Sequence, residues 1–184
     1  FLSPRLEGLF HGMHSEALSA ENLYRLKTRV QPSVDRKKAD EVTYFQHVLM
    51  RFELERDLIE GKLRIDDLPK AWVEKMDKYV GALPTNHREG CLQDVHWFVG
   101  KFGYFPSYAL GHMLAAQLYD TLKREMSDIR GSIAHGDFSE ITGWLNKHIY
   151  SKGRLLNMDE IIREATGKPL KAEYLEKHLR NRYL

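Results

Sequence analysis

The run DEVTYFQHVLMRFELERDLIEG, residues 40–61, carries the strongest helical signal of the chain. Its apolar side chains recur at intervals of three and four residues, a spacing that places them on one face of an α-helix. This apolar stripe consists of Val42, Phe45, Val48, Leu49, Phe52, Leu58 and Ile59. We therefore predict a helix from Asp40 to the stop signal at Gly61, with the apolar stripe facing a core.

Segments on both sides of this run also carry helical signals. Asn157 and Glu160 have the spacing of a capping box, and Gly167 is a helix stop signal. The further predicted helices cover residues 19–29, 66–80, 106–122, 129–134, 139–149, 158–166 and 172–182. Only residues 62–65 and 92–99 are candidates for short strands. The sequence thus predicts an all-α protein with at most one or two short strands.

The composition narrows the classes of protein and partner. Of the 184 residues, 42% are hydrophobic and 29% are charged, which is ordinary for one globular domain or two small ones. The formal net charge of +2 is too small to indicate a nucleic-acid partner. No apolar run approaches the roughly 18 residues needed to cross a bilayer, so no membrane partner is expected. The single cysteine, Cys91, excludes an internal disulfide and favours a reducing, cytoplasmic location.

Residues 90–117, which read GCLQDVHWFVGKFGYFPSYALGHMLAAQ, differ from the rest of the chain. They combine glycines with polar and aromatic side chains. Their first part belongs to residues 81–105, which we expect to form a long irregular connection, and connections longer than about 12–15 residues are often functional. An imidazole at His96 and phenols at Tyr104 and Tyr108 are groups that donate hydrogen bonds to a developing oxyanion. The alternative is that these rings form a small satellite core without any chemistry.

Three motifs resemble those of one peptidase family. Residues 90–97, GCLQDVHW, match the signature G-x-x-Q-D-x-H-W of the thermostable carboxypeptidase Taq family. The members of this family are zinc metallocarboxypeptidases of the gluzincin group. Residues 103–108, GYFPSY, look like the family segment G-Y-F-P-[ST]-Y. Residues 36–40, RKKAD, match the motif [IV]-R-x-x-A-D, except that Asp35 replaces the aliphatic residue. The resemblance covers the whole chain and implies a helical, gluzincin-type fold.

The same resemblance implies a zinc site that this sequence does not contain. In the family, zinc is held by the histidines of H-E-x-x-H and by the glutamate of a downstream H-E-S motif, and neither motif occurs here. His11 and His14 lack that framing and are interpreted as an exposed helix end. Family order places both zinc motifs upstream, and the chain begins at Phe1 without methionine. We expect residues 1–184 to be a C-terminal portion that holds no zinc and is inactive without the N-terminal half.

Roles for individual residues also follow from the resemblance. Arg36 is similar to the family arginine that receives the C-terminal carboxylate of the substrate. The alternative interpretation is that Arg36 is a surface charge in the run 36–38. His96 and Tyr108 resemble the pair that stabilises the tetrahedral oxyanion. Their alternatives are a hydrogen-bonded core histidine and an ordinary residue at a helix N-terminus.

The neighbours of this pair receive supporting roles. Gln93 and Asp94 are expected to orient His96 and the surrounding loop without contacting the substrate themselves. Tyr104 is expected either to contact substrate or to pack. No metal ligand is assigned within the chain.

Two functions from different classes follow. The first is a fragment of a zinc metallocarboxypeptidase that releases single amino acids from peptide C-termini. Its substrates are peptides, and the family resemblance implies that the whole enzyme is a homodimer. The second is a non-catalytic helical module that binds peptides or a partner protein.

Overall fold

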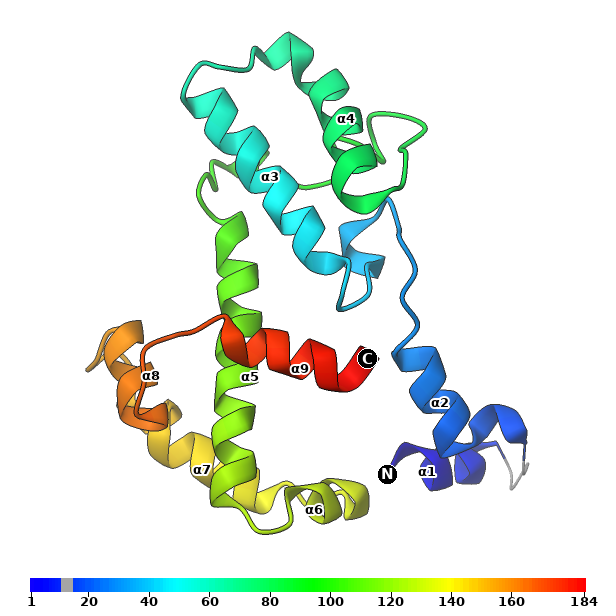
Figure 1. Ribbon diagram of the computed structural model, residues 1–184, viewed down its shortest axis with the longest axis vertical. Coiled ribbons are helices and arrows are strands. Elements are labelled where there is room, and N and C mark those ends of the chain that lie inside the picture. The colour runs from blue at the N-terminus through cyan, green and yellow to red at the C-terminus, as the bar shows by residue number, and fades with distance from the viewer. Residues whose placement is uncertain (11–14) are drawn as a thin grey trace. The chain divides into compact units, whose positions relative to one another are not determined.

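The computed structural model describes residues 1–10 and 15–184 of the chain (Figure 1). These described residues form helices and turns and contain no β-strand, which confirms the predicted all-α class. They divide into two compact units. The central unit is Thr28–Gly111, and the terminal unit consists of Phe1–Lys27 and His112–Leu184. The expectation of a single helical region over residues 1–184 stays a prediction.

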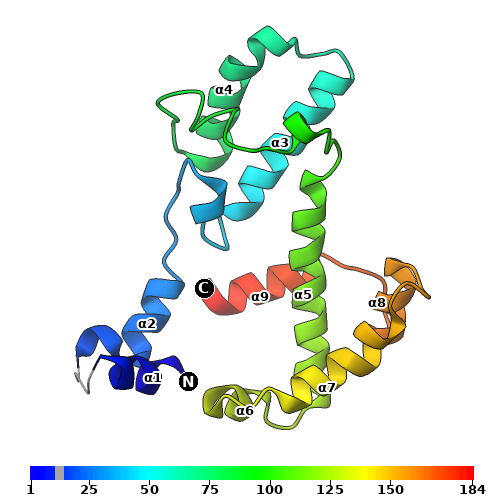
Figure 2. The ribbon, with the colours of Figure 1, turned by 180° about the vertical axis from the view of Figure 1, so that it is seen from behind.

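The central unit is built on a helical hairpin. Helices α3 (Tyr44–Ile59) and α4 (Leu68–Val80) lie side by side, and α5 (Phe105–Glu125) begins at the end of this unit. Short 3-10 turns occur at Arg36–Lys38, Ile65–Asp67 and Trp97–Val99. Seen from behind, the long connection between α4 and α5 returns past α3 (Figure 2). We call residues 90–104 of this connection the aromatic loop.

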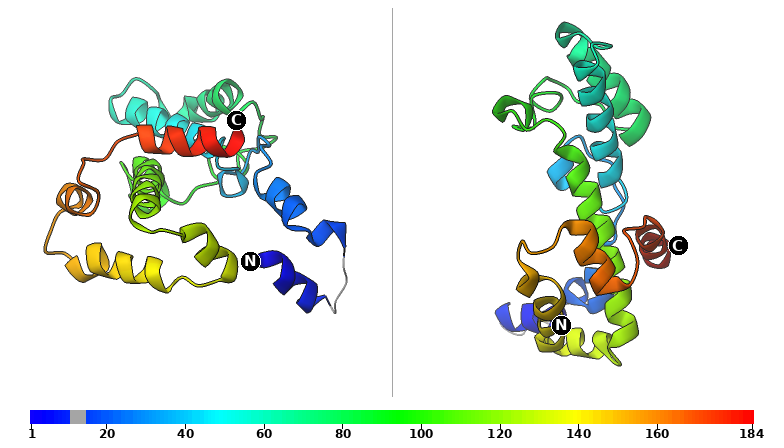
Figure 3. Two further views of the ribbon diagram at one scale, coloured as in Figure 1. Left: turned by 60° about the horizontal axis from the view of Figure 1, so that its bottom comes forward. Right: turned by 90° about the vertical axis from the view of Figure 1, so that its left-hand side faces the viewer.

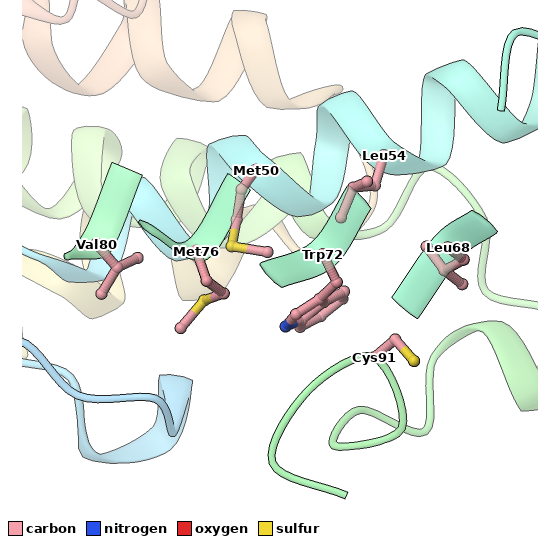
Figure 4. Close-up of a cluster of buried hydrophobic side chains, with 7 residues drawn as sticks. All are labelled: Met50, Leu54, Leu68, Trp72, Met76, Val80 and Cys91. Atoms are coloured by element: carbon pink, nitrogen blue, oxygen red, sulfur yellow. The ribbon is translucent and has the colours of Figure 1, made fainter. Parts of the chain in front are cut away.

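The apolar core of the central unit lies between the two helices of the hairpin and the aromatic loop. Figure 4 shows α4 directing a row of side chains at intervals of four residues into this core, with Cys91 below them. The buried members are Met50, Leu54, Leu68, Trp72, Met76, Val80 and Cys91. Full burial of such a side chain contributes about 1.5–3 kcal/mol. The hairpin is therefore held chiefly by this row.

The buried face of α3 is only partly the predicted one. Leu49 and Phe52 of the apolar stripe are 44% and 39% exposed. The buried positions are His47, Val48, Met50, Arg51, Leu54 and Glu55, three of which carry polar or charged side chains. The expectation that the apolar stripe faces a core is wrong for Leu49, Phe52 and Ile59, which are exposed, whereas Val48 is buried and Leu58 packs against the core. Polar side chains share the buried face because Arg51 and Glu55 have partners in the distant aromatic loop.

The start of α3 also differs from the prediction. The Asp40 carboxylate accepts hydrogen bonds from the backbone N–H groups of Val42, Thr43 and Gln31 at 2.8–2.9 Å. Burial raises the pKa of this carboxyl, but these hydrogen bonds outweigh that effect and hold the pKa below its ordinary value. The carboxylate thus closes a turn, and the helix begins only at Tyr44.

The two candidate strands form local turns instead. The backbone N–H groups of Lys62 and Leu63 donate to the Asp57 carbonyl and so close the end of α3. In residues 92–99, Leu92 N–H donates to the His87 carbonyl and Val99 N–H to the Val95 carbonyl. Backbone groups that are paired locally cannot form a strand ladder.

The terminal unit contains short helices, the rest of α5 and a second apolar cluster. Its helices are α1 (Leu2–Leu9), α2 (Ala20–Lys27), the rest of α5, α6 (Ile129–His135), α7 (Ser139–His148), α8 (Met158–Thr166) and α9 (Glu173–Tyr183). Its buried cluster contains Leu122, Met126, Ile129, Trp144 and Ala165. The capping box at Asn157 and Glu160 is confirmed, whereas α1 was not predicted and buries no side chain. None of the described helices is both long and apolar enough to cross a membrane.

The segment between α8 and α9, seen in Figure 3, is fastened to α5 by one amide. Gln117 is fully buried, and its Nε2 donates to Thr166 Oγ1 at 2.9 Å and to the Pro169 carbonyl at 3.0 Å. Its Oε1 accepts from the Lys171 backbone N–H at 3.0 Å. One side chain thus satisfies several polar groups that water does not reach.

Replacing this amide with an apolar side chain of similar shape tests its contribution. We expect Gln117→Met to lower the free energy of unfolding by about 2 kcal/mol, because buried polar partners are left unpaired. Urea denaturation followed by circular dichroism measures the change. The control is Asn146→Leu at an exposed position of α7, which we expect to change stability little. Equal stability of both variants would contradict this account of Gln117.

Candidate functional site

The site is organised around the carboxylate of Asp94 in the aromatic loop. Its Oδ1 accepts hydrogen bonds from Arg36 Nε at 3.2 Å and Arg36 Nη2 at 2.8 Å. Its Oδ2 accepts from Arg51 Nε at 2.6 Å. The Asp94 side chain is only 10% exposed, so both ion pairs are largely shielded from water. Three segments that are distant in sequence therefore meet at this carboxylate.

The charges of this cluster stabilise one another. Burial raises the Asp94 pKa, but the charge of Arg51 and the hydrogen bonds from both guanidiniums hold it below its ordinary value. Burial likewise disfavours the charge of Arg36, yet its hydrogen bonds and its attraction to Asp94 raise its pKa. Burial lowers the Arg51 pKa, although a guanidinium remains charged at any physiological pH. At neutral pH, two cations thus share one anion.

Arg36 presents the remaining part of its guanidinium next to aromatic rings. Its Nη1 donates to the Tyr44 hydroxyl at 3.1 Å, and its Cζ lies 4.9 Å from the centroid of the Tyr108 ring. Together with the Asp94 contacts, this uses three of the five N–H groups. Within the described residues, one N–H on each terminal nitrogen is left for another acceptor. Arg36 is only 8% exposed, so the alternative interpretation of Arg36 as a surface charge is wrong.

Gln93 connects the aromatic loop to the turn that carries Arg36. Its Nε2 donates to the carbonyls of Val34 at 3.1 Å and Glu89 at 2.6 Å. Its Oε1 accepts from the Arg36 backbone N–H at 3.3 Å. These contacts fix the backbone of Arg36, whereas Asp94 fixes its side chain.

His96 and Tyr108 form a direct hydrogen bond. His96 Nε2 lies 2.9 Å from the Tyr108 hydroxyl, and the imidazole packs against Phe105 with ring centroids 4.4 Å apart. Burial lowers the His96 pKa, an effect that Asp94 opposes and Arg36 reinforces. Burial also raises the Tyr108 pKa. A neutral imidazole and a protonated phenol are therefore present at neutral pH.

Tyr104 lies beside this pair. Its ring centroid is 5.6 Å from that of His96 and 5.3 Å from that of Tyr108, and the residue is 41% exposed. Asp94 Oδ1, which was expected to orient His96, lies 3.9 Å from His96 Nδ1, too far for a hydrogen bond. The structure thus brings all six predicted residues together within the central unit, with Asp94 bound to the arginines.

Sequence reasoning missed the contribution of α3. His47, Arg51 and Glu55 follow one another at intervals of four residues, which places them on one buried face of the helix. Glu55 accepts hydrogen bonds from the Trp97 indole N–H at 2.6 Å and from the Gly103 backbone N–H. This spacing of polar residues inside an apolar helix was the signal that could have identified the face.

The described part of the chain offers no metal centre. Within it, no three His, Cys, Asp or Glu side chains are placed so that they could hold a metal ion. His96, the histidine of the site, directs Nε2 to Tyr108. These residues do not fit a zinc site, and His11 and His14 lie outside the described residues. The expectation that this chain holds no zinc stays a prediction.

The buried ring of His47 predicts a pH dependence of stability. Burial and the charge of Arg51, opposed in part by the Ser33 backbone, lower its pKa from an ordinary 6.5 to about 4. Between these values the unfolded chain binds a proton that the folded protein excludes, so stability rises with pH. We expect about 3 kcal/mol to be lost as the pH falls from 6.5 to 4.

Urea denaturation at a series of pH values measures this slope. His47→Gln should flatten it, whereas His87→Gln, at an exposed position, should leave it unchanged. The stabilisation from Asp94 is distinct, because its pKa is lowered below an ordinary 3.8 and its contribution is lost only at more acid pH. An unchanged slope in His47→Gln would contradict the assignment.

Comparisons with known proteins agree on one family. Carboxypeptidase 1 of Bacillus subtilis is 38% identical over 166 residues, which are 90% of this chain and 33% of that protein. Thermostable carboxypeptidase 1 of Pyrococcus furiosus is 37% identical over 89% of this chain and 33% of its own length. The solved structure of Trypanosoma cruzi metallocarboxypeptidase 1 matches 100% of this chain and 38% of that chain, with a TM-score of 0.93 and 43% identity.

The chain therefore spans about a third of the length of the curated relatives it matches. The family model described as carboxypeptidase Taq (M32) metallopeptidase matches residues 1–183. The resemblance that the three motifs indicated is confirmed, and the chain belongs to the carboxypeptidase Taq (M32) metallopeptidase family.

Proposed function

We propose that the protein carrying this chain is a zinc metallocarboxypeptidase that releases single amino acids from peptide C-termini. Residues 1–184 supply the recognition of the substrate carboxylate and the stabilisation of the oxyanion. The observation that carries this proposal is the placement of the Arg36 guanidinium against the ring of Tyr108, which is hydrogen-bonded to His96. A carboxylate receptor and two oxyanion donors thus lie side by side in one unit.

Arg36 is suited to receive a terminal carboxylate. Asp94 and Tyr44 hold three of its N–H groups, so the guanidinium plane is fixed before a ligand arrives. The two remaining N–H groups lie on different terminal nitrogens, which allows paired, charge-assisted hydrogen bonds to two carboxylate oxygens. An internal amide has only one acceptor oxygen and no charge, so the receptor favours a free C-terminus.

His96 and Tyr108 are suited to stabilise a developing oxyanion. Their mutual hydrogen bond uses one proton, and both groups donate to a third oxygen only when that contact opens. Because the Tyr108 pKa is raised, its hydroxyl retains the proton that it must donate. Tyr104 contributes substrate contact at the exposed edge of the pair, and Gln93 holds the backbone of Arg36.

The remaining requirements of the reaction lie outside this chain. The family is one of metallopeptidases, and we propose zinc as its metal, bound by residues upstream of this chain. The N-terminal half of the same enzyme is the proposed partner, and a homodimer and a cytoplasmic location stay predictions. An apolar groove of about 470 Å³ over the exposed stripe of α3, lined by Phe45, Leu49, Phe52, Pro106 and Leu110 among others, supports a covering partner.

The carboxylate role of Arg36 is tested in the full-length protein with a matched pair of peptides that end in a free acid or an amide. We expect Arg36→Lys to lower kcat/KM for the acid by about 30- to 150-fold, since paired hydrogen bonds to a charged group contribute about 2–3 kcal/mol. Cleavage of the amide should hardly change. Arg56→Lys, at an exposed position of α3, is the control. If Arg36→Lys kept the wild-type ratio of kcat/KM for the acid to that for the amide, Arg36 would not be the carboxylate receptor.

The oxyanion role is tested by removing each donor in turn. His96→Ala and Tyr108→Phe should each lower kcat by about 100- to 1,000-fold, the usual cost of losing one oxyanion donor. Zinc content should be unchanged, because neither residue is proposed as a ligand. Tyr150→Phe, at an exposed position, is the control. Turnover near the wild-type value in both site variants would favour the alternative of a binding module without catalysis.

A further inference from the structure

Arg51 is the most deeply buried charge of the central unit, and the proposed function leaves it without a role. It is 0% exposed, and its Nη1 donates to the His47 carbonyl at 2.9 Å, with His47 Nδ1 at 3.3 Å. Its Cζ lies 4.6 Å from the centroid of the Trp72 ring. The helix backbone, the indole and Asp94 together hold this guanidinium in one orientation. It does not touch the open end of Arg36.

We propose that Arg51 is a positioning residue for carboxylate recognition. It holds Asp94 by Oδ2, and its positive charge compensates the negative charge of Asp94, which would otherwise neutralise the charge of Arg36. The inference rests on the proposed function of Arg36 as the carboxylate receptor.

A carboxylate held by one partner can rotate about its bond to Cβ and follow that partner. Asp94 is instead held on both oxygens, with Oδ2 2.6 Å from Arg51 Nε and Oδ1 2.8 Å from Arg36 Nη2. Because Arg51 is itself fixed by α3, the Asp94 carboxylate becomes a rigid reference for the Arg36 plane.

Arg36 and Asp94 alone would form a neutral pair, and a neutral pair attracts an anion only weakly at close range. Arg51 brings the group of three to a net charge of +1, and His47 adds none because its pKa is lowered to about 4. One incoming carboxylate then neutralises the cluster. Glu55, one turn further along α3, is occupied by Trp97 and Gly103.

Replacing buried ion pairs with apolar residues of similar volume is often neutral or stabilising, so burial of these charges is weak support for a stability role. Lysine at this position would keep the charge but could not place planar donors on Asp94 and on the His47 carbonyl together. Charge and geometry can therefore be separated by two variants.

The experiment measures binding of N-acetyl-phenylalanine and of its uncharged amide to the protein by NMR titration at pH 7. Arg51→Met should weaken binding of the acid at least tenfold and leave the amide unchanged. Arg51→Lys should weaken binding of the acid less than Arg51→Met does, because lysine retains the positive charge. Arg56→Met, on the same helix and about half exposed, is the matched control and should preserve the wild-type acid-to-amide ratio. A wild-type ratio in both Arg51 variants would overturn the proposal.

A second measurement needs no ligand and is independent of the proposed function. The Asp94 carboxyl, followed by carbon NMR across a pH series, should titrate at a higher pH in Arg51→Lys and Arg51→Met than in Arg56→Met. An unchanged Asp94 titration would overturn the proposal even if Arg36 is the receptor. Conversely, if Arg36→Lys retains the acid preference while Asp94 responds to Arg51, the proposed function fails and the link between Arg51 and Asp94 stands. If Arg51→Met does not fold, Arg51→Lys still decides both measurements.

Discussion

The carboxylate of Asp94, shared between two buried guanidiniums, is the interaction on which the central unit depends. It joins the turn at Arg36 and helix α3 to the aromatic loop, since Asp94 lies 58 residues beyond Arg36 and 43 residues beyond Arg51 in the sequence. Removing any one charge would leave the others buried without a full complement of partners, which typically costs several kcal/mol. The aromatic loop has no strand or long helix of its own, so these charged contacts and those of Glu55 give it a defined course.

The helical class and most helix positions were predictable from the sequence, because stop signals and capping residues act locally. Gly167 and the pair Asn157 and Glu160 delimit α8 as predicted. The orientation of α3 was not predictable in the same way. The periodicity of its apolar residues selects a stripe that is partly exposed, at Leu49, Phe52 and Ile59, and partly buried, at Val48. Burial of Arg51 depends on Asp94, whose position is set by long-range contacts that no local pattern encodes.

The candidate site was predictable as a set of residues and less so as a set of contacts. Short motifs identified Arg36, Gln93, Asp94, His96, Tyr104 and Tyr108, and the structure places these residues together. Their partners differ from expectation, since Asp94 binds the arginines and His96 binds Tyr108. A motif records which residue types are needed, whereas the hydrogen-bond partners depend on distances between segments. Arg51 lies outside the three motifs, and its proposed role is argued from its contacts with Asp94 and His47.

The two faces of α3 show how the central unit separates its tasks. The polar face directs Arg51 to Asp94 and Glu55 to Trp97 and Gly103, all within the unit. The apolar face is exposed at Leu49 and Phe52 and forms a groove with the start of α5. Burying that groove would contribute free energy roughly in proportion to its apolar area, without moving the charged groups on the other side. The proposed recognition site and the proposed partner surface thus lie on different faces of one helix, so substitutions on one face can be made without changing the contacts of the other.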